Sequence, residues 1–170
     1  MRPTTLCFPV NAQGQILLGR KKRGFGISKW NGFGGKIERG ETFRACAVRE
    51  LYEECHLIAD EAALQLVAYL DFRFPADPAY NHIGYVYFLH DWKGTVTASD
   101  EMEPCWFSAS SLPYDEMWKA DGIWIPMILS GRIISGTIVF GDDNDSIAHT
   151  DFSDTPGLLE QTVPDTFYAL

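Results

Sequence analysis

The sequence predicts a single domain that combines helices and strands, an α/β (α+β) fold. Its 170 residues are enough for one domain with a substantial core. Hydrophobic residues make up 46% and charged residues 22%, the balance of an ordinary globular protein. One long segment repeats apolar residues at helical spacing, and several short segments rich in β-branched and aromatic residues are separated by turns.

Six strands are expected, in three pairs. The strand-like segments are 4–10, 16–20, 64–74, 82–92, 132–140 and 146–152. They are joined in pairs by turn-forming sequences at 11–14, 75–78 and 142–145. Strands separated by so short a connection usually pair as an antiparallel hairpin, so we expect three hairpins. The glycine-rich stretch 24–35 is expected to form a loop or an irregular strand.

Residues 42–57 carry the strongest helical pattern. Neither Gly nor Pro interrupts them. Apolar residues recur there at helical spacing, at Phe43, Ala47 and Leu51. This spacing predicts one buried stripe along the helix. Thr42 or Glu41 supplies the oxygen that the first turn of a helix needs as a cap.

A second, shorter helix is expected at 122–129, where Pro126 lies in the first turns and is tolerated. From about residue 153 the composition changes, with more proline and few charges. We therefore assign residues 1–153 to the domain and 154–170 to a C-terminal tail of unknown role. Three of its residues offer side chains that could dock the tail on the domain: Phe167, Tyr168 and Leu170.

The net charge of −9 argues against a nucleic-acid polymer as partner, because such binding relies on many basic residues. The N-terminus lacks the layout of a signal peptide, and no apolar run approaches the roughly 20 residues that span a bilayer. The four cysteines show no metal-binding spacing and are expected to be reduced. We expect a cytoplasmic protein, a monomer without a membrane partner.

The long helix gathers acidic side chains at one place. Glu50, Glu53 and Glu54 are spaced so that they project from one face. Three carboxylates this close repel one another, and Arg49 offsets only part of that repulsion. A hard divalent cation, Mg²⁺ or Mn²⁺, supplies the missing charge best, since it prefers carboxylate oxygen. The alternative from these residues alone is an ordinary solvated acidic face.

The spacing around this helix resembles the Nudix box, G-x5-E-x7-R-E-U-x-E-E-x-G-U, in which U is aliphatic. The matching residues are Gly35, Glu41, Arg49, Glu50, Leu51, Glu53, Glu54 and Leu57. One position departs, because His56 stands where the pattern has its second Gly. Histidine is among the few residues that tolerate a positive φ, so the helix is expected to end there in a left-handed conformation.

The resemblance implies a Nudix fold, a mixed β-sheet sandwiched between α-helices, and metal-dependent hydrolysis of a phosphoanhydride bond. It implies that Glu50 and Glu54 are the main metal ligands and that Glu53 is a ligand or a base. Glu41 and Arg49 would support the helix and orient the glutamates. Further contacts implied for metal or phosphate come from Lys21, Gly34 through its carbonyl, Gly35, Lys36 and Glu101. For both lysines, a solvated surface position is the alternative.

Beyond the box, the chain is similar to the branch of MutT homologues that hydrolyse oxidised purine nucleoside triphosphates such as 8-oxo-dGTP. The similarity rests on segments 23–26, 30–36, 72–74, 100–107 and 117–118. By this resemblance, Trp118 would stack on the purine. The other residues implied for the base pocket are Thr5, Phe25, Asn31, Phe72, Phe74 and Asp121.

Ala120 departs from that branch, which carries two adjacent Asp residues after the stacking Trp. Only Asp121 remains, and alone it is expected to be ionised and to accept hydrogen bonds. We therefore expect cleavage of 8-oxo-dGTP to the monophosphate and pyrophosphate, with activity on 2-hydroxyadenine nucleotides in doubt.

Two alternatives stay open. One is a Nudix hydrolase of ADP-ribose, a dinucleoside polyphosphate or an unmodified nucleoside triphosphate. The other is a Nudix-fold domain that binds nucleotides without hydrolysing them. The retained glutamates of the box favour an enzyme over such a binding domain.

Overall fold

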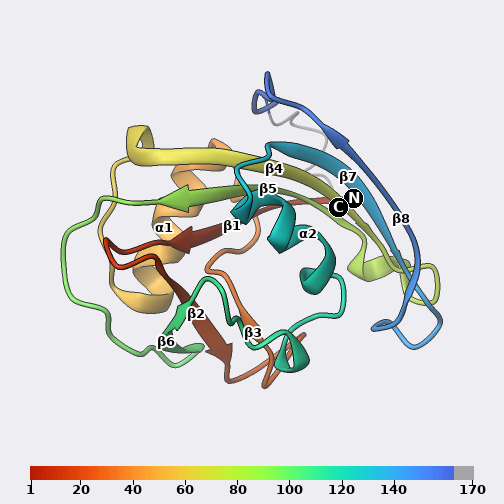
Figure 1. Ribbon diagram of the computed structural model, residues 1–170, viewed down its shortest axis with the longest axis horizontal. Coiled ribbons are helices and arrows are strands. Elements are labelled where there is room, and N and C mark those ends of the chain that lie inside the picture. Colours follow the sequence, from red (N-terminus) through yellow and green to blue (C-terminus); the bar gives the residue numbers. More distant parts are fainter. Residues whose placement is uncertain (163–170) are drawn as a thin grey trace.

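The computed structural model describes residues 1–162, which contain two β-sheets and two α-helices (Figure 1). The larger sheet has five strands in the order β1-β5-β4-β7-β8. In that order the strands are Arg2–Pro9, His82–Leu89, Leu64–Arg73, Ile134–Phe140 and Ile147–Asp154. β1 and β5 are parallel, as are β4 and β7, whereas β4–β5 and β7–β8 are antiparallel. The prediction of a mixed sheet is confirmed.

The smaller sheet has three strands in the order β3-β2-β6. They are Trp30–Asn31, Gln15–Lys21 and Met102–Ser108. The hairpin predicted for 4–10 and 16–20 is wrong, because β1 and β2 belong to different sheets and meet only at the bridge between Val10 and Ile16. The turn itself forms, with Gly14 N–H donating to the Asn11 carbonyl at 3.0 Å. A short turn fixes the reversal of the chain, but the distant β5 and β6 supply the partners.

The other two hairpins are confirmed as the antiparallel pairs β4–β5 and β7–β8. β6 was not predicted as a strand, although its seven residues pair with β2 from Met102↔Lys21 to Ser108↔Gln15. A strand that faces solvent on part of its surface has a weak alternation, and Pro104 inside it weakens the pattern further.

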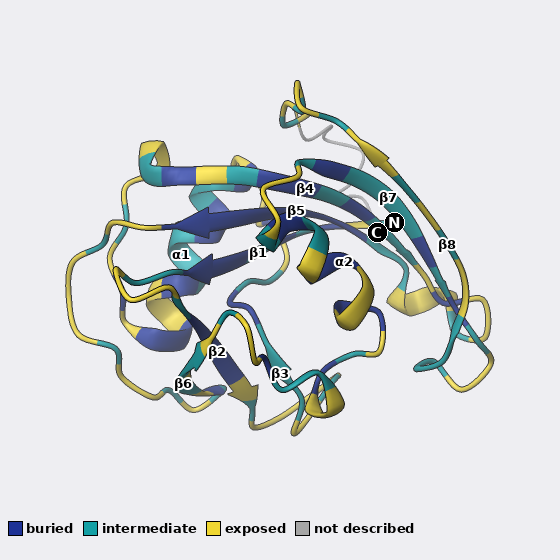
Figure 2. Ribbon diagram, in the orientation of Figure 1, coloured by how far each residue is buried: buried dark blue, intermediate teal, exposed yellow. Residues whose placement is uncertain are grey.

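Two hydrophobic cores lie on opposite faces of the large sheet. Along β5, Val86 and Phe88 pack in one core, whereas Tyr85 and Tyr87 pack in the other. The first core is closed by α2, Asp121–Leu129, and the second by α1, Phe43–Cys55. Figures 1 and 2 show α2 in front of the sheet and α1 behind it, with the central strands buried between them.

The long helix forms where its sequence predicts. The Thr42 side chain caps it by accepting from the Ala45 N–H at 3.0 Å. Phe43, Ala47 and Leu51 are buried, as the predicted stripe requires. His56 ends the helix with φ 63° and ψ 17°, the left-handed conformation that we expected at this departure from the box. Histidine at the position of the box glycine therefore still ends the helix in the left-handed conformation.

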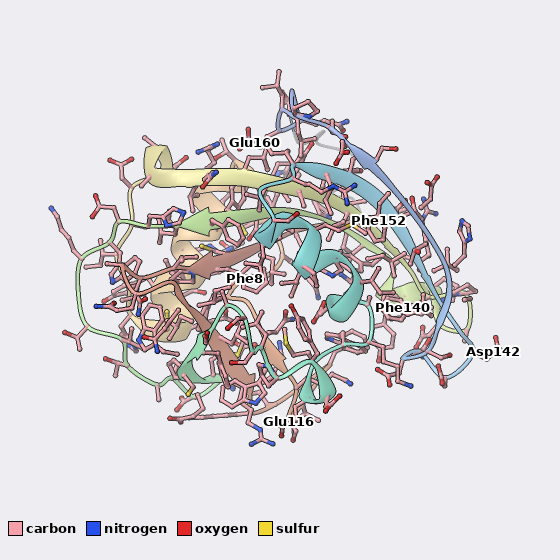
Figure 3. All side chains as sticks on the ribbon, viewed as in Figure 1. Phe8, Glu116, Phe140, Asp142, Phe152 and Glu160 are labelled. Carbon is pink, nitrogen blue, oxygen red and sulfur yellow. The ribbon has the colours of Figure 1, made fainter. Side chains whose placement is uncertain are left out.

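Residues 155–162 continue past β8 and lie against the second core. Leu158 packs on that core, and Glu160 pairs with Arg44 of α1 at 2.7 Å. The Tyr85 hydroxyl accepts from Gln161 N–H at 2.9 Å. Figure 3 shows Glu160 far from Asp142, which marks the β7–β8 turn. The docking residues predicted farther along, Phe167, Tyr168 and Leu170, lie outside the described residues.

All four cysteines are free thiols. Within residues 1–162, neither helix has both the length and the apolar character needed to cross a membrane.

Candidate active site

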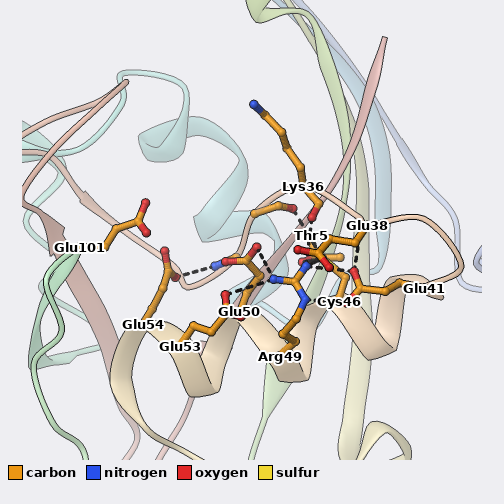
Figure 4. Close-up of polar contacts among 12 residues, drawn as sticks. Thr5, Lys36, Glu38, Glu41, Cys46, Arg49, Glu50, Glu53, Glu54 and Glu101 are labelled. Atoms are coloured by element: carbon orange, nitrogen blue, oxygen red, sulfur yellow. Dashed lines mark hydrogen bonds and ion pairs between the residues drawn. The ribbon is translucent and has the colours of Figure 1, made fainter. Parts of the chain in front are cut away.

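Arg49 organises the acidic face of α1. Its guanidinium donates to both carboxylate oxygens of Glu41, at 2.6 and 2.9 Å. The same group donates to Glu50 Oε1 at 3.0 Å and to Glu53 Oε2 at 3.1 Å (Figure 4). These hydrogen bonds lower the pKa of Glu41 and raise that of Arg49 above its ordinary value. One arginine thus fixes three of the predicted box glutamates.

Glu54 points away from Arg49 and is buried, with 2% of its surface exposed. Its Oε2 accepts from the Gly34 N–H at 2.9 Å. The pKa of Glu54 is raised to about 8, mainly by burial and also by the charges of Glu50 and Glu101. Burial also raises the pKa of Glu50. Burial thus raises the pKa of both carboxyls, although Arg49 still pairs with Glu50.

Two glycines let the neighbouring loop approach this helix closely. A Cβ on Gly35 would overlap the Glu50 carboxylate, and a Cβ on Gly34 would overlap the Thr5 carbonyl. The loop is tied to β1 by Thr5 N–H donating to the Gly35 carbonyl at 2.9 Å. Only residues without a side chain fit between the strand and the acidic helix.

Glu101 reaches the same face from the segment before β6. Figure 4 shows it opposite Glu54, and its charge raises the pKa of both Glu50 and Glu54. Glu101 pairs with Lys21 at 3.4 Å and with Arg23 at 3.9 Å. The structure therefore brings Glu101 and Lys21, which the sequence placed far apart, to the acidic helix.

The donor chemistry at this face fits a hard divalent cation. Glu50, Glu54 and Glu101 offer carboxylate oxygens, which such ions prefer, and burial raises the pKa of the first two. Within residues 1–162, no three Asp, Glu, His or Cys side chains are close enough to hold an ion as they stand. Arg49 holds Glu50 and Glu53, and Lys21 holds Glu101, which keeps the carboxylates apart.

A cleft of about 670 Å³ opens beside this face. Its wall includes Glu50, Glu53, Glu101, Gly34 and Gly35, whereas the buried Glu54 is not among the residues that line it. The predicted base-pocket residues line the other part of the same cleft: Thr5, Phe25, Asn31, Phe72, Phe74, Trp118 and Asp121. Lys21 and Lys36 lie on its wall as well. The cleft therefore joins the two groups of predicted site residues.

Aromatic rings form one side of the cleft. Phe25, with 40% of its surface exposed, stacks on Trp118 at 4.9 Å between ring centroids and on Tyr80 at 4.1 Å. The Lys29 ammonium lies 4.8 Å from the centroid of the Trp118 ring. Gly24 and Gly26, with φ of 77° and 79°, flank Phe25 and bring its loop against the indole. Trp118 thus lies in the wall of the cleft, in contact with Phe25 and Lys29.

Asp121 is 4% exposed and begins α2. Its Oδ1 accepts from the buried Trp124 Nε1–H at 3.0 Å, while Oδ2 has no partner within residues 1–162. Burial raises the pKa of Asp121 to about 7, so the carboxyl is only partly ionised at neutral pH, whereas the sequence led us to expect full ionisation. Ala120, 1% exposed, packs in the core.

Asn31 and Thr5 differ in what they offer the cleft. Asn31 Oδ1 accepts from Gly32 N–H at 2.9 Å, which leaves its amide N–H groups for a ligand. The Thr5 hydroxyl instead contacts Cys46 Sγ of α1 at 3.4 Å. The Thr5 hydroxyl is therefore already in contact with α1.

Sequence reasoning missed several residues of the cleft wall, among them Thr4, Leu6, Lys29, Tyr80 and His82. Thr4, Leu6 and His82 alternate on strands β1 and β5, so they appear in the sequence as ordinary strand positions. The stacking of His82 on Phe72, at 4.6 Å, depends on strand register. A correct prediction of the β4–β5 register would have placed His82 beside Phe72 and so identified it as a residue of the cleft wall.

Comparisons with known proteins agree with this fold. The Nudix domain model matches residues 1–128. The oxidized purine nucleoside triphosphate hydrolases of Mus musculus and Danio rerio are each 37% identical over 136 residues, covering 80% of this chain and 85% of each relative. The MutT protein structure from Bacillus halodurans superposes with a TM-score of 0.76 at 21% identity, covering 89% of this chain and 97% of that chain.

A MutT Nudix hydrolase structure from Burkholderia pseudomallei superposes with a TM-score of 0.63 at 24% identity, covering 75% of this chain and 99% of that one. Both structures share the Nudix fold. With a matching domain model and relatives of this similarity, the chain belongs to the Nudix hydrolase family.

Proposed function

We propose that this protein hydrolyses oxidised purine nucleoside triphosphates, releasing the monophosphate and pyrophosphate from substrates such as 8-oxo-dGTP. The observation that carries the proposal is the single cleft shared by the acidic face of α1 and an aromatic base-sized pocket. The mouse and zebrafish relatives, which are named for this activity, support the choice of substrate. This activity would remove damaged nucleotides from the precursor pool.

A divalent cation fits this proposal. Glu50, Glu54 and Glu101 are the residues that would hold Mg²⁺ or Mn²⁺, with the Gly34 carbonyl as a further oxygen and Glu53 as a ligand or base. When bound, the ion would neutralise charge on the phosphates and activate a water molecule. Arg49 keeps Glu50 and Glu53 oriented through the hydrogen bonds described above, and Glu41 in turn fixes Arg49.

The phosphate chain would lie between the acidic face and the basic residues of the cleft. Lys21 is held near that face by Glu101, and Lys36 follows the close-packed glycines. Their ammonium groups can contact phosphate oxygens as point charges. The absence of a side chain at Gly35 lets the Glu50 carboxylate approach this loop closely.

The purine would stack on Trp118 next to Phe25, a contact worth roughly 1–3 kcal/mol in other base-binding sites. Asn31 would donate to the base edge through its free amide N–H groups. Asp121 would meet the base with Oδ2, which has no partner within residues 1–162. Because its pKa is about 7, Asp121 can accept as a carboxylate or donate as an acid near neutral pH.

A panel of nucleotides tests the proposal. We expect kcat/KM with Mg²⁺ to be highest for 8-oxo-dGTP, lower for 2-hydroxy-dATP because Ala120 offers no second carboxyl, and lowest for dGTP. Removal of one charged hydrogen-bond partner costs roughly 1.5–3 kcal/mol, or about tenfold to a hundredfold. Values within threefold for all three would contradict the proposal. Preferential cleavage of ADP-ribose or a dinucleoside polyphosphate would establish a different substrate for this Nudix hydrolase. Binding of nucleotides without turnover would establish a non-catalytic domain.

Residues 1–153 are proposed as the catalytic unit. The contacts of Leu158 and Glu160 support a structural role for the start of the C-terminal segment. The monomeric state and the cytoplasmic location stay predictions.

A further inference from the structure

His82 is the one imidazole that lines the cleft within residues 1–162. It begins β5 and lies opposite Phe72 of β4 in the strand register. Its ring stacks on Phe72 at 4.6 Å and an interplanar angle of 21°, and it lies 6.1 Å from Phe74. His82 is therefore part of the same wall as two residues of the proposed base pocket.

The contacts of His82 fix which nitrogen carries the proton. Nδ1 lies 2.7 Å from the Tyr80 carbonyl oxygen. A carbonyl only accepts, so Nδ1 donates and Nε2 carries no proton in the neutral ring. Burial lowers the pKa of His82, which favours that neutral ring. The negative charge of Asp71 acts in the opposite direction and raises the pKa of His82. Asp71 also pairs with Arg73 through two hydrogen bonds, so its charge is shared.

His82 lines the cleft, and its Nε2 is a hydrogen-bond acceptor to which no group within residues 1–162 donates. The backbone carbonyl that orients the ring belongs to Tyr80, which stacks on Phe25. Phe25 in turn stacks on Trp118. The acceptor is thus held in position by the same aromatic group that would bind the base.

Oxidation of a purine at C8 changes the edge that an acceptor meets. An unmodified purine presents the lone pair of N7, whereas an 8-oxopurine carries a hydrogen on N7. An acceptor therefore attracts the oxidised edge and repels the unmodified one. We propose that His82 Nε2 accepts a hydrogen bond from N7–H of an 8-oxopurine and so serves as a specificity-determining residue. This inference rests on the proposed function and names the atom that distinguishes oxidised from unmodified substrate.

The first test separates the acceptor from the ring. His82→Phe keeps an aromatic ring against Phe72 but removes the acceptor, whereas His82→Gln keeps an acceptor on a side chain of similar reach. Dissociation constants for 8-oxo-dGMP and dGMP, measured by calorimetry, report the preference independently of turnover. We expect His82→Phe to reduce the preference for 8-oxo-dGMP roughly tenfold and His82→Gln to retain it within threefold. His90→Phe, at an exposed residue directly after β5, is the matched control.

The second test uses the unaltered protein, so it does not depend on the folding of a variant. The nucleotide 7-deaza-dGMP has a C–H group in place of N7 and therefore lacks both the lone pair and the added donor. We expect affinities in the order 8-oxo-dGMP, 7-deaza-dGMP, dGMP. Binding of dGMP equal to or tighter than that of 7-deaza-dGMP would overturn the role of His82.

The outcomes distinguish the two proposals. If the unaltered protein prefers 8-oxo-dGMP and His82→Phe keeps the full preference within twofold, the role of His82 is wrong while the proposed function stands. If the unaltered protein shows no preference for the oxidised nucleotide, both the substrate assignment and the role of His82 fail.

Discussion

The acidic face of α1 and the aromatic pocket beside it are built in opposite ways. The box supplies most of the acidic face within residues 34–57, and one arginine orders three of its glutamates. The pocket draws on segments near residues 25, 31, 72–82 and 118–121, which meet only in the folded protein. The first region is defined by spacing along a helix, and the second by strand register and loop packing. Chemistry that is local in sequence can therefore be inferred with more detail than recognition that is not.

The largest effect is expected at the acidic face. Glu54→Gln removes a carboxylate but keeps an oxygen that can accept the Gly34 N–H. We expect kcat to fall on the order of 10²–10⁴-fold, the range for loss of a catalytic proton-transfer group or its equivalent, with the fold retained. Pyrophosphate release with Mg²⁺ and circular dichroism measure the two results. Glu103→Gln, an exposed residue of β6, should leave kcat unchanged. Near-normal turnover by Glu54→Gln would contradict the assigned role.

The next effect separates recognition from chemistry. Trp118→Ala removes the stacking surface, so KM for a purine triphosphate is expected to rise roughly 10- to 100-fold. The value of kcat at saturation should change little, because stacking contributes to ground state and transition state alike. Steady-state kinetics measure both constants. Trp118→Phe should recover part of the affinity, whereas Trp92→Phe, at a ring that stacks on Trp106 outside the cleft, serves as control. An unchanged KM in Trp118→Ala would remove the indole from the base site.

Asp121 provides a pH test of the pocket. Burial raises its pKa to about 7 in the fold, while the unfolded chain titrates near the ordinary 3.8. A raised carboxyl pKa means that the folded state holds its proton while the unfolded state loses it. The stability that this proton confers is complete below about pH 4, declines as pH rises through the window from 4 to 7, and is absent above 7.

Asp121→Asn mimics the protonated group at every pH, so its stability relative to the unaltered protein should increase from pH 5 to pH 8. We expect a change of roughly 1–3 kcal/mol, or several degrees in Tm, measured by thermal unfolding at both pH values. Asp115→Asn, exposed in the preceding loop, should not reproduce this trend. A difference that is the same at both pH values would show that Asp121 is ionised throughout.

The same contrast explains which parts of the molecule the sequence could predict. The bounds of α1, its Thr42 cap and the left-handed His56 all follow from residues within one helix. The antiparallel pairs β4–β5 and β7–β8 follow from strands joined by short connections. The pairing of β1 with β5 could not be predicted in this way. The two strands are about eighty residues apart in the sequence, and no local pattern indicates which strand pairs with which.

Within the site, the box residues and the aromatic positions were accessible through the family resemblance. Two properties were not. The ionisation of Asp121 depends on burial by distant elements, which raises its pKa beyond what its lone position suggests. The place of His82 in the cleft depends on its register against Phe72. Both are consequences of tertiary packing.

The smallest expected effect concerns the contact of the C-terminal segment with α1. Arg44 lies in the first turn of the helix, and its guanidinium donates to Glu160 at 2.7 Å and to the carbonyls of Glu61 and Leu64 at 2.8 Å. Since both partners are largely buried, Glu160→Gln should cost about 0.5–1.5 kcal/mol of stability. Activity should be unchanged, because the acidic face is ordered by Arg49, which lies farther along α1 than Arg44.

Chemical denaturation measures the cost of Glu160→Gln, and Asp154→Asn is the matched control. Asp154 pairs with Arg132 at the same distance of 2.7 Å, but its side chain is 64% exposed compared with 23% for Glu160. Water screens the exposed pair, so Asp154→Asn should cost less than Glu160→Gln. Equal costs would mean that residues 155–162 only rest on the domain. A fall in kcat with Glu160→Gln would show instead that the order of the acidic face depends on this distant contact. The acidic face would then not be defined by the residues of the box alone.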